Sequence, residues 1–269
     1  MLENLFAKKP VLDDEAIDWM FEGFSWALKN LGGENFKANT ILVEPSNRHF
    51  PGRETSEHGM AQLIFEQVKQ YAGVSHWPCQ LIDRATFEAS GLSILNIRNV
   101  LASQSGEQPV PLLIPYEPLQ ARNPEVMIAN YAYTIAYHMA DLSPEPLPCK
   151  DDQWPYFLEL IAVYLGFGVM MVNTALPKRG GGCGSCRSPL MERHGFLSEN
   201  EVTYALAIFC VLKGIPAKDV TPLIKKHERL FLKKAMKDVA ERSGQIQVLT
   251  ALENGKGQTE GGRFLPAPS

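Results

Sequence analysis

The sequence predicts an α+β fold, with a small sheet and helices in the N-terminal part and a helical C-terminal half. The candidate strands, which are short, apolar and bounded by turn-forming residues, all precede residue 120. After residue 120, apolar residues recur every three or four positions over long segments, which is the spacing of amphipathic helices. The 269-residue chain is 45% hydrophobic and 21% charged, as is usual for soluble globular proteins.

The first predicted helix is capped by Asp13 or Asp14 and runs to about Leu31, where a pair of glycines ends it. The segment "NTILVEP" (39–45) follows. Because it is apolar and ends at a proline, we expect it to form a short buried strand.

A second helix is predicted from a cap at Thr55 or Ser56 to about Tyr71. The segments "CQLIDR" (79–84) and "VPLLIPYE" (110–117) are predicted as two further strands of the small sheet.

The C-terminal half begins with a strong helix start at residues 123–125, which supply an Asn cap, a Pro at the first helical position and a Glu in the first turn. A long helix from about Trp154 to Ala175 is expected next. Ser198 and Glu201 have the spacing of a capping box, which predicts the start of another helix.

A last helix is predicted over residues 217–242. We therefore expect an N-terminal α/β part over residues 1–120 and a helical part over residues 121–245, packed on it as one unit. The end of the chain lacks apolar patterning, so residues 246–269 are expected to form a disordered tail.

Charge and apolar runs exclude several classes of partner. The formal net charge of −4 and the absence of a concentrated basic face argue against nucleic-acid binding. The most apolar run, residues 160–172, is shorter than the roughly 20 residues that cross a bilayer, so we expect a buried helix and no membrane contact. The N-terminus has no signal-peptide pattern, and the five cysteines are an odd number. These features favour a reducing compartment, the cytoplasm.

The segment "NYAYTIAYHMADL" (130–142) has the outline of a metallopeptidase helix. Two His at positions i and i+4 lie on one helix face and hold zinc, and a Glu after the first His activates the metal-bound water. Here those positions are Tyr133, Thr134 and Tyr137, and His138 is shifted by one position. A phenol with a pKa near about 10 is a poor zinc ligand at neutral pH, so these residues alone favour a buried helix.

Three segments carry a family resemblance: "PEVMIANYAYTIAYHMADL" (124–142), "DQWPYFLELIAVYLGFGVMMVNTA" (152–175) and "GFLSENEVTYALAIFCVLKG" (195–214). Together they resemble a bacterial family of zincin-type metallopeptidases with a His-Glu-x-x-His motif. The resemblance covers about residues 50–213 and implies a zincin-like fold.

The family's functional positions can be carried over one by one. Its two zinc-binding His positions fall on Tyr133 and Tyr137, and its catalytic Glu falls on Thr134. Its acidic third ligand falls on Glu159, which is retained in type. The resemblance therefore implies a degenerate, catalytically inactive member with a structural or protein-interaction role and no cofactor.

Two further expectations concern Glu159. A buried carboxylate needs hydrogen-bond donors, so we expect a phenol of Tyr133 or Tyr137 to donate to it. The alternative hypothesis is that the protein is a hydrolase whose catalytic residues are His138 and Glu159 instead of the motif positions.

A second candidate site is the glycine-rich segment "GGGCGSCRS" (180–188). Cys183 and Cys186 have the Cys-x-x-Cys spacing that places two thiolates on one metal or joins them as a disulfide. A structural zinc site needs four ligands, which Cys149 and His194, or a second copy of the pair in a symmetric dimer, would complete. The remaining interpretations are a redox pair and a loop with two free thiols.

Overall fold

The computed structural model of the protein describes residues 11–91, 100, 111–176, 193 and 195–255. Within these residues the chain is mostly helical and contains one two-stranded parallel sheet, which confirms the α+β class. The elements are α1 (Asp14–Leu31), α2 (Gly33–Asn39), α3 (Glu57–Tyr71), β1 (Cys79–Asp83), α4 (Arg84–Ser90), β2 (Leu112–Tyr116), η3 (Pro118–Arg122), α6 (Pro124–Leu142), η4 (Asp151–Gln153), α7 (Trp154–Ala162), η5 (Val163–Phe167), α8 (Gly168–Thr174), α9 (Glu199–Leu212), α10 (Ala217–Val220), η7 (Thr221–Leu223), α11 (Arg229–Glu241) and α12 (Ser243–Glu253).

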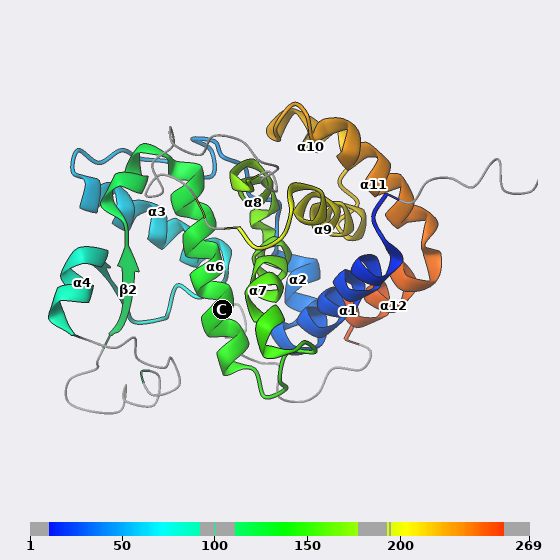
Figure 1. The fold of residues 1–269 in the computed structure, drawn as a ribbon, viewed down its shortest axis with the longest axis horizontal. Helices are drawn as coiled ribbons and strands as arrows, with labels where there is room; N and C mark the ends of the chain where they lie inside the picture. The colour runs from blue at the N-terminus through cyan, green and yellow to red at the C-terminus, as the bar shows by residue number, and fades with distance from the viewer. Residues whose placement is uncertain (1–10, 92–99, 101–110, 177–192, 194, 256–269) are drawn as a thin grey trace, which may run out of the picture.

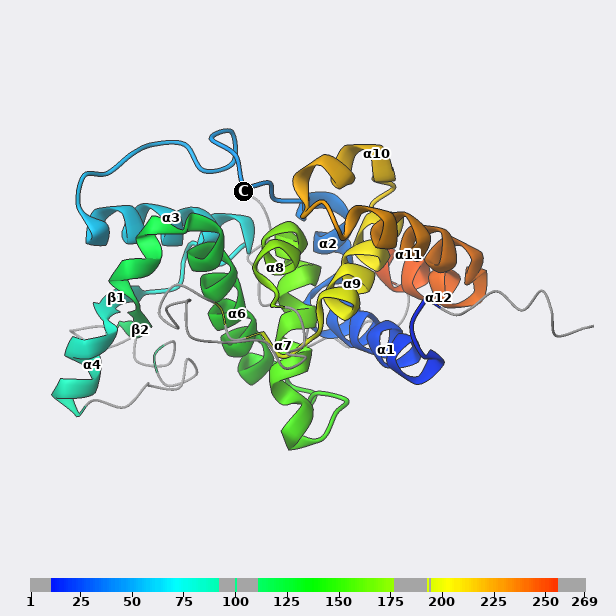
Figure 2. The same ribbon diagram turned by 45° about the horizontal axis from the view of Figure 1, so that its top comes forward.

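Helices α7 and α8 run through the middle of the molecule (Figures 1 and 2). On one side they contact α6, which in turn contacts α3, and the sheet lies beyond α6. On the other side lie α1, α2, α9 and the pair α11–α12. The buried apolar residues of all these helices form one continuous core.

The residues before 120 lie on two sides of the central helices. Helix α1 packs against α12 and α7, and α2 against α12, whereas α3, β1 and α4 lie beyond α6 on the opposite side (Figures 1 and 2). The amphipathic α1 thus buries its apolar face among the C-terminal helices.

Local signals set the ends of several helices as predicted. Asp13 caps α1 by accepting a hydrogen bond from the Ala16 amide at 2.8 Å, and Gly32, with φ at 102°, ends the helix. Ser56 caps α3 through the Gly59 amide. The capping box at the start of α9 is also confirmed, since Ser198 and Glu201 bond to each other's amide groups.

The sheet pairs β1 and β2 in parallel, with Cys79 opposite Leu112 and Asp83 opposite Tyr116. Both strands were predicted. The predicted strand over residues 39–45 is wrong: α2 extends to Asn39, and the next residues are irregular. The amide of Val43 donates to the Gly166 carbonyl at 2.9 Å, so this segment pairs with a helix bulge instead of a sheet.

The predicted long helix over residues 154–175 is interrupted by a π turn, η5, at which Gly166 has φ of 99°. A Cβ atom at Gly166 would collide with the carbonyl oxygen of Ile41. The segment Asp151–Thr174 is long and apolar enough to cross a membrane, yet 89% of its most apolar window is buried inside the protein. It is therefore a core helix, as predicted.

The predicted last helix over residues 217–242 is also broken. Asn173 of α8 holds the break, because its side chain donates to the Leu223 carbonyl and accepts from the Lys225 amide, each at 3.0 Å. A continuous helix would use both backbone groups internally. The chain therefore turns before α11 begins at Arg229.

The expected disordered tail is wrong for residues 246–253. These residues belong to α12, which buries Leu249 and Leu252. Residues 256–269 lie outside the described part of the chain.

Candidate functional site

Helix α6 carries the four candidate positions from the sequence, Tyr133, Thr134, Tyr137 and His138. Tyr133 is half-buried, whereas Tyr137 is 42% exposed. The hydroxyl of Thr134 donates to the Asn130 carbonyl of its own helix at 3.0 Å, so it is engaged with the backbone. The side chain of His138 points into the core.

Glu159 on α7 is fully buried and has a complete set of partners. The guanidinium of Arg193 forms an ion pair with it, and the amides of Phe196 and Leu197 donate to its two oxygens at 3.2 and 2.8 Å. We expected a tyrosine phenol as the donor. Among the described residues the donors are instead a guanidinium and two backbone amides, because the segment before α9 folds over the carboxylate.

Arg193 is buried as completely as its partner. Its Nε donates to the Thr174 hydroxyl at 3.0 Å and its Nη2 to the Met171 carbonyl at 3.3 Å. A buried ion pair is tolerated when its remaining donors and acceptors are also satisfied. The pair Glu159–Arg193 meets that condition and ties α7 and α8 to the segment before α9.

The charges of Glu159 and Arg193 affect the pKa of the nearby Tyr133 phenol. Burial raises the pKa of the Tyr133 phenol to about 12, the Glu159 carboxylate adds to the increase, and Arg193 opposes it. At neutral pH the phenol is therefore protonated and is not an anionic metal ligand.

His138 is 3% exposed and lies beside the rings of Trp77 and Tyr137. Burial lowers the pKa of His138 to about 4, so the imidazole is neutral at pH 7. Its Nδ1 has no hydrogen-bond partner within the described structure. The hydrogen-bond partners of Glu159 do not include His138. Within the described residues the two side chains are therefore not joined by a hydrogen bond.

Exposed aromatic rings cover the outer side of this region. We call Tyr133, Tyr137, Trp154, Tyr156 and Phe196 the aromatic strip. Its rings are linked by contacts between Tyr133 and Phe196 (centroids 6.2 Å apart), Tyr156 and Phe196 (5.8 Å), and Tyr137 and Trp154 (6.0 Å).

The strip is accessible, since Tyr137, Tyr156 and Phe196 are each at least 40% exposed. Aromatic side chains of this size are usually buried in a monomer or in an interface. The exposed residues Asp151 and Asp152 lie immediately before Trp154 and place negative charge at that end of the strip.

The second predicted site falls mostly outside the described residues. Cys183, Cys186 and His194 belong to the segments that the structure does not describe. Cys149 is a half-buried free thiol, and its pKa is raised by burial and by Asp151 and Asp152.

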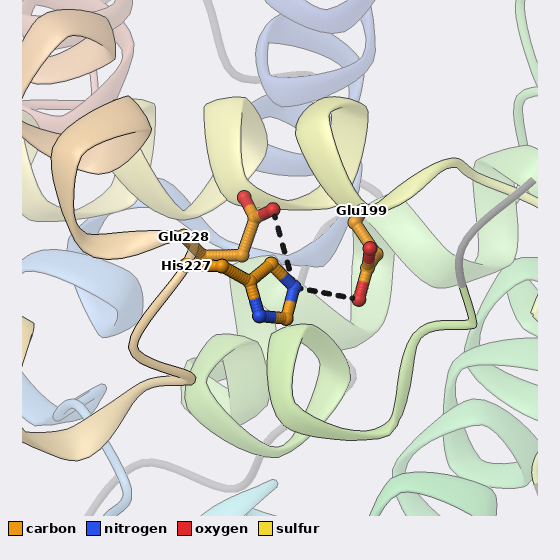
Figure 3. A group of neighbouring side chains, drawn as sticks. All are labelled: Glu199, His227 and Glu228. Atoms are coloured by element: carbon orange, nitrogen blue, oxygen red, sulfur yellow. Dashed lines mark hydrogen bonds and ion pairs between the residues drawn. The ribbon is translucent and has the colours of Figure 1, made fainter.

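A group of possible metal ligands that the sequence did not predict lies where α9 and α11 begin. Glu199, His227 and Glu228 point toward one another (Figure 3), and one ligand atom from each lies within 4.8 Å of the others. His227 Nε2 is 3.2 Å from Glu199 Oε1 and 3.7 Å from Glu228 Oε1. The adjacent pair His227–Glu228 is a weak sequence signal, because Glu199 is distant in the chain and a continuous helix would separate the two side chains.

Lys225 supports Glu199 from the other side. Its ammonium group lies 2.9 Å from Glu199 Oε1 and also donates to the Ala175 carbonyl. Burial raises the pKa of Glu199, but the hydrogen bonds and charges of Lys225 and His227 outweigh it, so the pKa lies below its ordinary value. Glu199 is therefore ionised at neutral pH.

Comparison of the chain with protein-family models, with curated proteins and with solved structures finds no match. The resemblance to zincin-type metallopeptidases therefore rests on the residues quoted above.

Proposed function

We propose that the protein is a catalytically inactive relative of zincin-type metallopeptidases that acts by binding another protein. The observation that carries the proposal is the state of Glu159, the position of the acidic third ligand. Its carboxylate is fully buried and both of its oxygens accept hydrogen bonds. A zinc ligand needs a free lone pair directed at an open coordination site.

The ion pair with Arg193 also neutralises the negative charge of the buried Glu159 carboxylate. In a zinc site, the metal cation neutralises the buried carboxylate. Here the guanidinium of Arg193, which is 2% exposed, supplies positive charge to Glu159 directly. Together with the tyrosines at both His positions and Thr134 at the Glu position, this supports loss of the metal and of the water-activating base.

The aromatic strip is the proposed interaction surface. Tyrosine and tryptophan carry much of the binding energy in protein interfaces, because they bury large areas with few rotatable bonds. Tyr137 and Tyr133 are one helical turn apart on α6, so the two groups of linked rings face the same side of the helix.

The partner that fits this surface is a protein segment with lysine or arginine. Its cationic side chains would pack over the ring faces of the strip and pair with Asp151 and Asp152 beyond Trp154. For the compartment we propose the cytoplasm, which is supported by the free thiols of Cys79, Cys149 and Cys210.

A displayed library of random peptides, selected against the full chain, tests the surface. We expect enrichment of basic sequences. Tyr137→Ala is expected to weaken the selected peptides at least about tenfold, the effect of a typical interface hot spot. Leu230→Ala on α11, which removes another exposed hydrophobic side chain, is the matched control and should leave binding unchanged.

The charge variant Asp151→Lys/Asp152→Lys should shift selection toward acidic sequences. Equal peptide binding by the wild type and Tyr137→Ala would refute the proposed surface. Peptide hydrolysis in the presence of Zn²⁺ that Glu159→Gln abolishes would refute the proposed loss of catalysis.

A further inference from the structure

The group at the start of α9 and α11 is independent of the aromatic strip and of the proposed function. From its geometry we infer that Glu199, His227 and Glu228 bind a divalent transition-metal cation, with Zn²⁺ as the best fit (Figure 3).

Two of the three distances between the ligand atoms are those of a coordination shell, and the third is at most 4.8 Å. With metal–ligand bonds of about 2.0–2.2 Å, adjacent ligands of a tetrahedral zinc ion stand about 3.3–3.6 Å apart. His227 Nε2 lies 3.2 Å from Glu199 Oε1 and 3.7 Å from Glu228 Oε1. Small side-chain adjustments would therefore place all three around one ion, with water in the fourth position.

Glu228 supplies a second, independent indication. The residue is 4% exposed, and its Oε2 accepts a hydrogen bond from the buried Thr203 hydroxyl at 2.9 Å. Its Oε1 is directed at His227 Nε2 from 3.7 Å, beyond hydrogen-bond range. A buried carboxylate needs compensating positive charge, and a bound cation at Oε1 would supply it.

The surroundings orient two of the ligands in advance. Thr203 fixes the Glu228 carboxylate, and Lys225 holds the Glu199 carboxylate at 2.9 Å. Such outer partners restrict the orientation of metal ligands. The side chain of His227 is 61% exposed, so it is the mobile ligand through which a cation would enter.

Charge and ligand type select the metal. Two carboxylates opposed by the single ammonium of Lys225 leave the site net negative while the imidazole is neutral. Mg²⁺ and Ca²⁺ prefer shells made of oxygen, whereas zinc binds both imidazole nitrogen and carboxylate oxygen.

The test is a calorimetric titration of ZnCl₂ into the full chain after chelator treatment. All proteins carry Cys183→Ser/Cys186→Ser, so that the cysteine pair contributes nothing. We expect saturable binding of about one equivalent, as for a single defined site. His227→Ala should weaken it at least tenfold, while His76→Ala, which removes an exposed histidine elsewhere, should not.

Further variants separate ligation from folding. His227→Cys keeps a zinc ligand and should retain most of the affinity, and Thr203→Val should weaken binding about tenfold by releasing Glu228. His227 is exposed, so its replacement does not threaten the fold. No saturable binding, or equal affinity for the His227→Ala protein and its parent, would overturn the inference and leave an ion-pair network with Lys225.

Discussion

Two regions of the molecule each contain a glutamate and a histidine, residue types that can bind a metal, and the two pairs differ in burial and in hydrogen-bond partners. Around α6 and α7, Glu159 and His138 are both buried and have different partners. At the start of α9 and α11, Glu199 and His227 are 3.2 Å apart, and the imidazole side chain is 61% exposed.

The difference shows that residue type alone does not decide whether a cation can bind. Glu159 accepts hydrogen bonds from three groups, one guanidinium and two backbone amides, and both of its oxygens are occupied. Glu228 has one oxygen bonded to Thr203 and the other directed at an exposed imidazole. The inferred site therefore differs from Glu159 in having a carboxylate oxygen that faces an exposed imidazole instead of a fixed donor.

The largest expected effect comes from removing the buried cation. Arg193→Met leaves the Glu159 carboxylate buried without its counter-charge, which should lower the free energy of unfolding by about 3–5 kcal/mol. Lys225→Met is the matched control at the more open carboxylate, Glu199, and should cost about 1 kcal/mol. Urea unfolding of both variants at neutral pH measures the difference.

A second substitution separates charge from packing in this experiment. Adding Glu159→Gln to Arg193→Met should recover part of the lost stability, because a neutral amide needs no counter-charge and its one oxygen still accepts from the amide of Phe196 or of Leu197. If the double variant is as unstable as the sum of the two single variants, the ion pair is not the source of the effect.

The two histidines give the next largest contrast. Burial lowers the pKa of His138 to about 4, so the unfolded chain binds this proton more readily than the folded one. Stability should therefore fall as the pH drops from about 6.5, the unfolded pKa, toward 4, with a loss of about 3 kcal/mol from this group at pH 4. Denaturant unfolding across this pH range measures it.

His138→Leu should flatten that part of the pH profile, since the Nδ1 atom that it removes has no hydrogen-bond partner within the described structure. His76→Leu is the comparison, because His76 is exposed and should account for a smaller share. An unchanged profile in His138→Leu would contradict a neutral, buried imidazole.

The smallest expected effect concerns Tyr133. Burial, with the help of Glu159, raises its pKa to about 12. Subtracting the absorbance titration of Tyr133→Phe from that of the wild type isolates this phenol. In Glu159→Gln the pKa should fall, because the negative charge is gone and Arg193 remains; a rise would mean that the carboxylate does not act on the phenol.

Features with local causes were predictable from the sequence. Asp13, Ser56 and Ser198 cap helices through amides within three residues of themselves, so the caps are visible in the chain order. The two strands of the sheet were also recognisable from their composition. The burial of Glu159 was expected from its place before a long apolar run.

Features that depend on distant contacts were not predictable. The break before α11 is held by Asn173, more than one helix away, and the π turn at Gly166 bonds to Val43. The partner of Glu159 proved to be Arg193, which no spacing rule connects with it. The group Glu199–His227–Glu228 forms only because the predicted last helix is broken.

The contact between α1 and α12 has a consequence for biosynthesis. Arg242 and Gln245 bond to Asp14 and Asp18, so residues of α1 find their partners more than two hundred residues later in the chain. Until α12 has left the ribosome, the apolar face of α1 has no cover from that side. Nascent chains that stop before Ser243 would expose it and become substrates for chaperones and proteases.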